Sequence, residues 1–329
     1  VGSLVCVYAH KTTVGWATIV EALRRTGFIV TEAWPLDTER DAGFRIDKAM
    51  LSSSIFLVAR KRDIEAGVGQ YENIVQPELE MIVRERVDTL WDMGITGADL
   101  VIASVGAGLR AFTRYERVEY ANGEEVPAEK FLTEVEGVVL DTMMAKLFGV
   151  SGGNVSSVDP ESRFYVLWRF VYRTSEIDAG EAIVFTYSQH VELDSPHGLS
   201  VGKDALVEKK KGKYRIRDFT ERGQHDKLGL PTDDGQPAPL IDVLHRVLWL
   251  IENSPRKVAE FLEEARPDRE RLRVLAQTLS GAALSGKSEQ DIERLVSTTP
   301  AEQTALGKLL ANWRTLIESQ LIKTEGRLL

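Results

Sequence analysis

The opening residues constrain the fold of this chain more than any other segment. Residues 1–9 form a continuous apolar run, which is typical of a strand buried on both faces of a sheet. A helix with an apolar stripe is predicted over 16–23, a second strand over 28–34 and a third over 54–61. Three strands and one helix cannot cover both faces of a buried sheet. The sequence therefore predicts that other strands of this sheet belong to polypeptide outside the chain.

The composition sets limits on the class of protein. Of the 329 residues, 43% are hydrophobic and 28% are charged, which is the balance of an ordinary globular domain. No segment approaches the roughly 20 consecutive apolar residues that cross a bilayer. The first residues lack the charged leader and the cleavage site of a signal peptide. Because Cys6 is the single cysteine, an internal disulfide and a multi-cysteine zinc ribbon are excluded within the chain. We expect a cytoplasmic protein with no metal and no membrane contact.

Several short motifs match one enzyme family, in the same order along the chain. They are Tyr8-Ala9-His10-Lys11, Trp16, Ala22-Leu23, Gly27-Phe28, Trp34-Pro35-Leu36, Leu57-Val58-Ala59-Arg60-Lys61, Gly97-Ala98-Asp99-Leu100, Arg163-Phe164-Tyr165-Val166-Leu167-Trp168-Arg169 and Leu240-Ile241-Asp242-Val243-Leu244-His245. The chain resembles the C-terminal part of the large adenine-specific DNA methylases, the zinc-ribbon-containing group associated with anti-phage defence loci. This resemblance implies the last third of a doubly wound, S-adenosylmethionine-binding sheet, in which the final two strands form an antiparallel hairpin.

The catalytic motif of that family is absent from the chain. The motif places Asp or Asn before two prolines and an aromatic residue, and it holds the flipped adenine beside the methyl donor. None of the 11 prolines is adjacent to another, and no glycine-rich cofactor loop follows an early strand. We therefore expect no catalytic residue here and no activity from this chain alone. S-adenosylmethionine would bind in the complete enzyme, whose catalytic region lies upstream or in a separate subunit.

The predicted fold class is an α/β remnant of a doubly wound methyltransferase sheet, followed by a mainly α-helical region with a winged-helix-like basic hairpin. Four segments are expected: the end of a Rossmann-like methyltransferase domain (1–66), a helical region with a small hairpin (72–150), a winged-helix-like region (151–222) and a C-terminal helical region (237–329). Helices are predicted over 77–94, 97–115, 127–147, 160–171, 179–190, 241–252, 258–264, 269–279 and 300–321.

The main candidate for DNA contact is the basic hairpin at residues 207–217. Six of these eleven residues are Lys or Arg, against the single acid Glu208. Two helices followed by a basic hairpin is the order of a winged-helix module, in which the hairpin touches phosphates. The predicted contacts to double-stranded DNA are Lys209, Lys210, Lys211, Lys213, Arg215 and Arg217. The alternative is a solvated hairpin whose lysines prevent edge-to-edge pairing. The formal net charge of -9 argues against a globally basic surface, so a local patch is needed.

Other features leave alternatives open. His10 and Lys11 follow the opening strand at its carboxyl end, where they would line the cleft near the target base or form an ordinary loop leading into a helix. Residues 106–111 match a dinucleotide fingerprint, which would suit an NAD-type enzyme, but a packed helix with small residues is favoured. His190, His197, His225 and His245 show no metal-ligand spacing. His245 stands alone on a predicted helix and is predicted to be a core residue. A further alternative is a non-enzymatic interaction subunit of a DNA-modification, restriction-modification or phage-defence complex, docking through a sheet edge.

Overall fold

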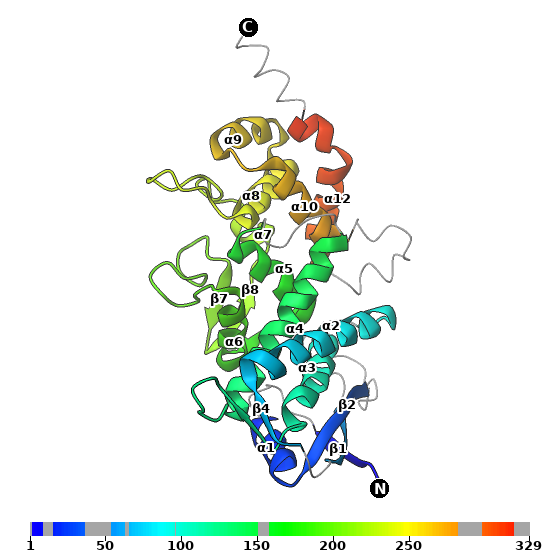
Figure 1. The fold of residues 1–329 in the computed structure, drawn as a ribbon. Helices are drawn as coiled ribbons and strands as arrows, with labels where there is room; N and C mark the ends of the chain where they lie inside the picture. The colour runs from blue at the N-terminus through cyan, green and yellow to red at the C-terminus, as the bar shows by residue number, and fades with distance from the viewer. Residues whose placement is uncertain are drawn as a thin grey trace. The chain divides into compact units, whose positions relative to one another are not determined.

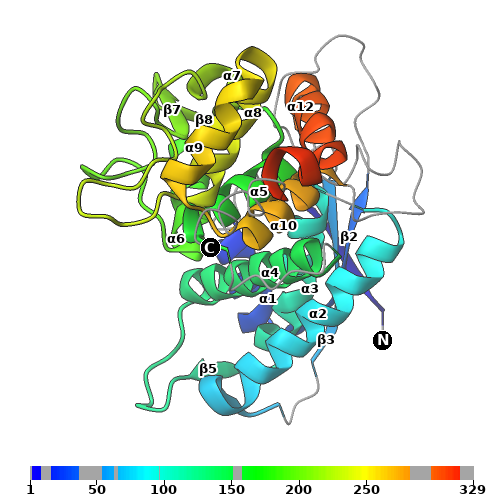
Figure 2. The same cartoon turned by 90° about the horizontal axis from the view of Figure 1, so that it is seen from above.

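The computed structural model describes residues 2–8, 16–36, 54–62, 66–95, 97–150, 158–281 and 298–318. The chain divides into two compact units, Val1–Met143 and Met144–Leu329 (Figures 1 and 2). It is mixed α/β and mostly helical, with small sheets, as the sequence predicted in outline. Among the described residues, no helix combines the length and the apolar character that a bilayer span requires.

The first unit contains a three-stranded sheet. Its elements are β1 (Leu4–Tyr8), α1 (Ala17–Arg25), β2 (Phe28–Leu36) and β3 (Ser54–Lys61). The strand order is β1-β3-β2, and β3 runs antiparallel to both neighbours, so β1 and β2 are parallel. A β-bulge between Val30 and Glu32 shifts the register of β2, which turns Val30 and Ala33 to the same face although they are three residues apart.

A helix covers that face of the sheet at close range. The helices that follow the sheet are α2 (Gln76–Asp92), α3 (Gly97–Thr113) and α4 (Ala128–Val150). α3 packs on β2 so closely that a Cβ on Gly106 would lie 2.4 Å from the Cβ of Ala33. At the end of α3, the hydroxyl of Thr113 accepts a hydrogen bond from the backbone N–H of Val30 at 2.9 Å. The small residues of α3 therefore set the distance between this helix and the sheet.

The opening strand is largely exposed within this chain. Within the described residues β1 pairs with β3 alone, and Val5 and Val7 are 54% and 56% exposed. The register gives the reason: Cys6 lies opposite the buried Leu57, which faces α3, whereas Val5 and Val7 point to the opposite face. The strands expected to cover β1 would belong to polypeptide outside the chain, so its burial on both faces stays a prediction. Among the described residues, no strand pairs with the outer edge of β1, and the face that carries Val5 and Val7 is exposed.

Two small elements lie between the segments predicted to end at residue 66 and to begin at residue 72. They are β4 (Val68–Gln70) and a π-helical turn, η2 (Tyr71–Val75), which leads into α2. β4 pairs in parallel with β5 (Arg117–Glu119). Because β5 pairs with β4, the small hairpin predicted within 72–150 is reduced to one antiparallel bridge between Glu119 and Glu125. Gly123, in the turn between them, lies in the left-handed region at φ 84°.

The second unit is a cluster of helices with a small sheet. Its helices are α5 (Pro160–Tyr172), α6 (Ala179–Gln189), α7 (Phe219–Arg222), α8 (Leu240–Asn253), η4 (Pro255–Lys257), α9 (Val258–Ala265), α10 (Arg269–Ser280), α12 (Pro300–Ala311) and η5 (Arg314–Glu318). Its strands are β6 (Ile177–Asp178), β7 (Val207–Lys210) and β8 (Lys213–Ile216). α8 packs against α5, α10 and α12. The predicted start of α5 is confirmed, since the carboxylate of Asp159 accepts from the N–H of Ser162 at 2.9 Å.

Candidate nucleic-acid interface

The predicted basic hairpin is present in the second unit. β7 and β8 pair antiparallel as far as Lys210 and Lys213, so Lys211 and Gly212 form a two-residue turn. Both turn residues have positive φ, 52° and 77°, as a type I′ turn requires. The face that carries Tyr214 is directed into the unit, because Tyr214 is buried. The opposite face carries the cross-strand pairs Glu208–Arg215 and Lys210–Lys213.

Three of the six predicted DNA contacts have partners inside the unit. The ammonium of Lys209 lies 2.6 Å from the Oδ2 of Asp194. Arg215 donates from Nε to Glu208 at 2.5 Å and from its two Nη atoms to Glu221 at 3.0 and 2.6 Å. Arg217 donates to backbone carbonyl oxygens, and its Nη1 lies 3.0 Å from the carbonyl oxygen of Lys203. These contacts give the three cations a structural role.

The partner of Lys209 is itself held by several donors. Hydrogen bonds from Lys209, Ser200 and the hydroxyl of Tyr214 lower the pKa of Asp194 to about 2. Asp194 therefore stays ionised at neutral pH, and its charge compensates that of Lys209 beside the stem of the hairpin.

The other three cations are presented to solvent. Lys210, Lys211 and Lys213 are exposed, and no ion pair joins their side chains to any residue in the described ranges. Lys210 lies directly opposite Lys213, an arrangement of like charges that destabilises a strand pair. The left-handed backbone of Lys211 adds about 1–2 kcal/mol of local strain. We call these three residues the lysine tip.

A third strand and a helix accompany the hairpin. β6, a two-residue strand that the sequence did not reveal, pairs with β8 and gives the sheet order β6-β8-β7. The helix before the hairpin, α6, contains Glu181 but no lysine or arginine. A helix without cations offers no charge to the phosphates of DNA. The hairpin is therefore the candidate interface.

The remaining sequence candidates do not form a second site in the described chain. His10 and Lys11 lie outside the described residues. Residues 100–103, where the dinucleotide alternative requires a strand, are helical, and Gly106 lies inside α3. A Cβ on Gly108 would lie 2.7 Å from Val135 and 2.9 Å from Leu79. The favoured interpretation, a packed helix with small residues, is confirmed.

Sequence reasoning missed a buried ionic cluster between α5, α8 and α12. The Oε1 of Glu302 accepts from the hydroxyl of Tyr165 at 2.6 Å and lies 3.5 Å from the Nε2 of His245. Its Oε2 lies 3.5 Å from a guanidinium nitrogen of Arg169, which also donates to Tyr165. Glu302 and His245 are fully buried, which confirms His245 as a core residue. The cluster is closed to solvent and joins three helices.

The electrostatics of the cluster follow from its burial. Desolvation lowers the pKa of His245 to about 4, although the neighbouring Glu302 acts in the opposite direction. The pKa of Glu302 is also lowered, since the charge of Arg169 and the hydrogen bonds outweigh desolvation. A sequence signal existed, because Thr299 stands three residues before Glu302 as in a capping box. That signal predicts a helix start but not a buried charge.

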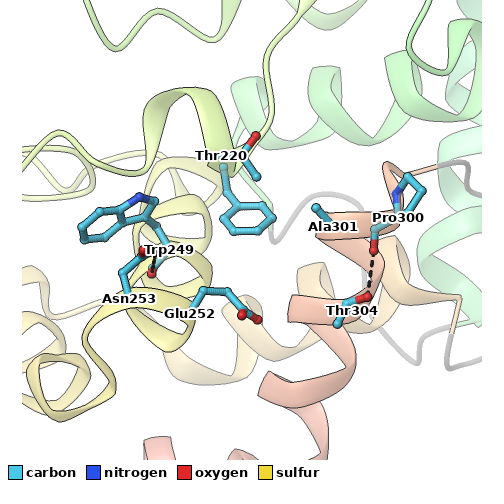
Figure 3. A pocket seen from close by; sticks show the side chains of 8 residues that line it. Thr220, Trp249, Glu252, Asn253, Pro300, Ala301 and Thr304 are labelled. Atoms are coloured by element: carbon cyan, nitrogen blue, oxygen red, sulfur yellow. Dashed lines mark hydrogen bonds between the residues drawn. The ribbon is translucent and has the colours of Figure 1, made fainter.

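A groove lies between α7, α8 and α12 (Figure 3). It has a volume of about 570 Å³ and is lined by Phe219, Thr220, Trp249, Glu252, Asn253, Pro300, Ala301 and Thr304. Glu252 is paired with Lys308 at 2.9 Å, so its charge is compensated. The lining holds no histidine, cysteine or lysine, and the described ranges contain no cluster of metal-ligating side chains. The groove therefore offers no evident catalytic chemistry.

Comparison with known proteins gives no relative. No protein-family model, curated protein or solved structure matches the chain. A functional assignment therefore depends on the motifs and the geometry of the chain itself.

Proposed function

We propose that the chain is the DNA-contacting C-terminal segment of an S-adenosylmethionine-dependent, adenine-specific DNA methyltransferase. The single observation that carries the DNA contact is the lysine tip, whose three charges are exposed and uncompensated by neighbouring acids. The catalytic region and the cofactor site belong to other polypeptide in this proposal. The glycines of the dinucleotide alternative cannot form a cofactor loop, because neighbouring side chains occupy the space beside Gly106 and Gly108. No chemical step is assigned to this chain.

The number of presented charges sets the expected strength of binding. Each phosphate contact contributes about -0.9 to the slope of log K against log salt concentration, so three lysines predict about -2.7. Affinity for duplex DNA should then fall about 40-fold between 50 and 200 mM salt. Since these contacts are to phosphates, binding by the tip alone should be independent of sequence. The net charge of -9 keeps the affinity low.

The test compares two variants with the same change of charge. Replacing Lys210, Lys211 and Lys213 with alanine should remove most of the salt slope, measured by fluorescence anisotropy with a labelled duplex. The control replaces three exposed cations elsewhere in the same unit with alanine: Lys227, Arg256 and Lys257. The control should keep the slope of the unaltered protein. Equal salt slopes for the unaltered protein, the lysine-tip variant and the control variant would show that the hairpin makes no phosphate contact.

The sheet of the first unit supports the requirement for a catalytic partner. β2 and β3 form the antiparallel pair that the resemblance implies for the end of the sheet. The outer edge of β1 pairs with no strand of the described chain, and the exposed Val5 and Val7 beside it bear no charge. An apolar edge strand of this kind is normally covered by a further strand.

The same edge also favours the alternative, a non-enzymatic interaction subunit of a DNA-modification or phage-defence complex. Co-expression with a candidate catalytic subunit, followed by size-exclusion chromatography, tests whether a complex forms. Methylation of duplex adenine by that complex then separates the two functions. A stable complex that transfers no methyl group supports the interaction subunit. If replacing Val5 and Val7 with charged residues leaves the complex intact, the catalytic subunit does not bind at the edge of β1.

A further inference from the structure

Arg215 lies at the centre of the hairpin stem with every guanidinium nitrogen engaged. Its Nε reaches Glu208 on the opposite strand, and its two Nη atoms make a bidentate contact with both carboxylate oxygens of Glu221. Bidentate arginine–carboxylate contacts fix geometry as well as charge. This arrangement leaves Arg215 poorly disposed to receive a phosphate, although the sequence suggested that role.

The partner of Arg215 belongs to a chain of contacts that ends on another helix. Glu221 is the third residue of α7 and accepts from the N–H of Asp218 at 3.3 Å, which completes a capping box. One carboxylate oxygen of Asp218 accepts from the N–H of Thr220 at 2.9 Å. The other accepts from the hydroxyl of Thr299, the N-cap of α12, at 2.8 Å. The stem of the hairpin is thereby fixed to α7 and α12.

The lysine tip needs such an anchor. β7 and β8 have four residues each, and β6 adds a pairing partner of two residues. At their far end, Lys210 and Lys213 repel each other and Lys211 adopts a left-handed conformation. Local forces at the tip therefore favour opening of the hairpin.

We infer that Arg215 is a positioning residue, which holds the lysine tip closed through Glu208 and Glu221 and makes no phosphate contact of its own. The DNA part of this inference rests on the proposed function. The closure of the hairpin does not, so the two can fail separately.

The test uses Arg215→Met in the full chain, with two readouts. Trypsin cleavage after Lys210 and Lys211 should become about five-fold faster, as expected when a well-formed bidentate pair is lost. DNA affinity should fall by a similar factor while the salt slope stays unchanged. Arg215→Lys should rescue cleavage resistance only in part, because an ammonium cannot make the bidentate contact.

Each result has a defined meaning. A salt slope reduced by about 0.9 in Arg215→Met would make Arg215 a direct phosphate contact and overturn the inference. Unchanged trypsin cleavage would overturn it as well. If the unaltered protein binds no DNA, the proposed function fails, and the cleavage rates still decide the role of Arg215. If Arg215→Met does not fold, Glu221→Gln breaks the same ion pair while an amide oxygen remains for the capping box.

Discussion

Replacing Gly106 with alanine should push α3 away from the sheet that it covers. The added Cβ would lie 2.4 Å from the Cβ of Ala33, 3.5 Å from Leu57 and 3.6 Å from the ring of Trp16. Carbon atoms pack at about 3.5–4.0 Å, so the helix must retreat by roughly 1 Å. Because the Cβ of Ala33 is attached directly to the strand backbone, rotation of a side chain cannot relieve the contact.

Two opposing effects set the magnitude. Alanine is favoured over glycine in a helix interior by about 1 kcal/mol. Overpacking of a well-packed core costs about 1–3 kcal/mol. Since Ala33, Leu57 and Trp16 are all at most 1% exposed, the surroundings have little room to adjust, and the overpacking cost lies in the upper part of that range, about 2–3 kcal/mol. We expect a net loss of about 1–2 kcal/mol in the free energy of unfolding, which lowers the melting temperature by about 2–8 °C.

A second glycine provides the control. Gly137 lies inside α4, and a Cβ added there would meet no atom within 4 Å. Gly137→Ala should therefore show the helix preference alone and stabilise the protein by about 0.5–1 kcal/mol. Urea denaturation followed by tryptophan fluorescence measures both variants. If Gly106→Ala were as stabilising as Gly137→Ala, the close packing of α3 on β2 would be refuted.

Two predictions concern the buried cluster of the second unit. Glu302→Ala leaves Arg169 buried without its carboxylate and should lower the free energy of unfolding by about 3–5 kcal/mol in urea denaturation. Glu302→Gln keeps an acceptor for Tyr165 and should lower the free energy of unfolding by less. Equal losses of stability in the two variants would contradict the assigned contacts. Burial lowers the pKa of His245 from its ordinary value of 6.5 to about 4 in the folded state, so between these pH values the unfolded chain binds a proton that the folded chain does not. Its stabilising contribution is complete above pH 6.5 and is lost as the pH falls toward 4, so the urea midpoint should decline over that window. His245→Gln should flatten the decline, and an unchanged pH profile in that variant would show that other groups cause it.

Features that depend on residues close together in the chain could be predicted before the fold was known. The start of α5 at Pro160 and most helices of the second unit occur where the sequence predicted them. These signals are local because a cap, a two-residue turn or an apolar stripe is completed within a few residues of chain. The basic hairpin was predictable for the same reason.

Contacts between residues far apart in the chain set which charges remain available and which strands are covered. Composition made the six cations of the hairpin equivalent. In the structure, Asp194 compensates Lys209, and Glu208 and Glu221 compensate Arg215. Arg217 donates to backbone carbonyl oxygens, whereas the lysine tip has no ion pair with the described residues. The exposure of β1 and the pairing of the two-residue strand β6 likewise follow from the neighbours that packing supplies. The hydrogen bond from Tyr165 to Glu302 joins residues 137 positions apart. The burial of a side chain and the pairing of its charge depend on many contacts from across the folded unit. A local sequence pattern does not contain that information.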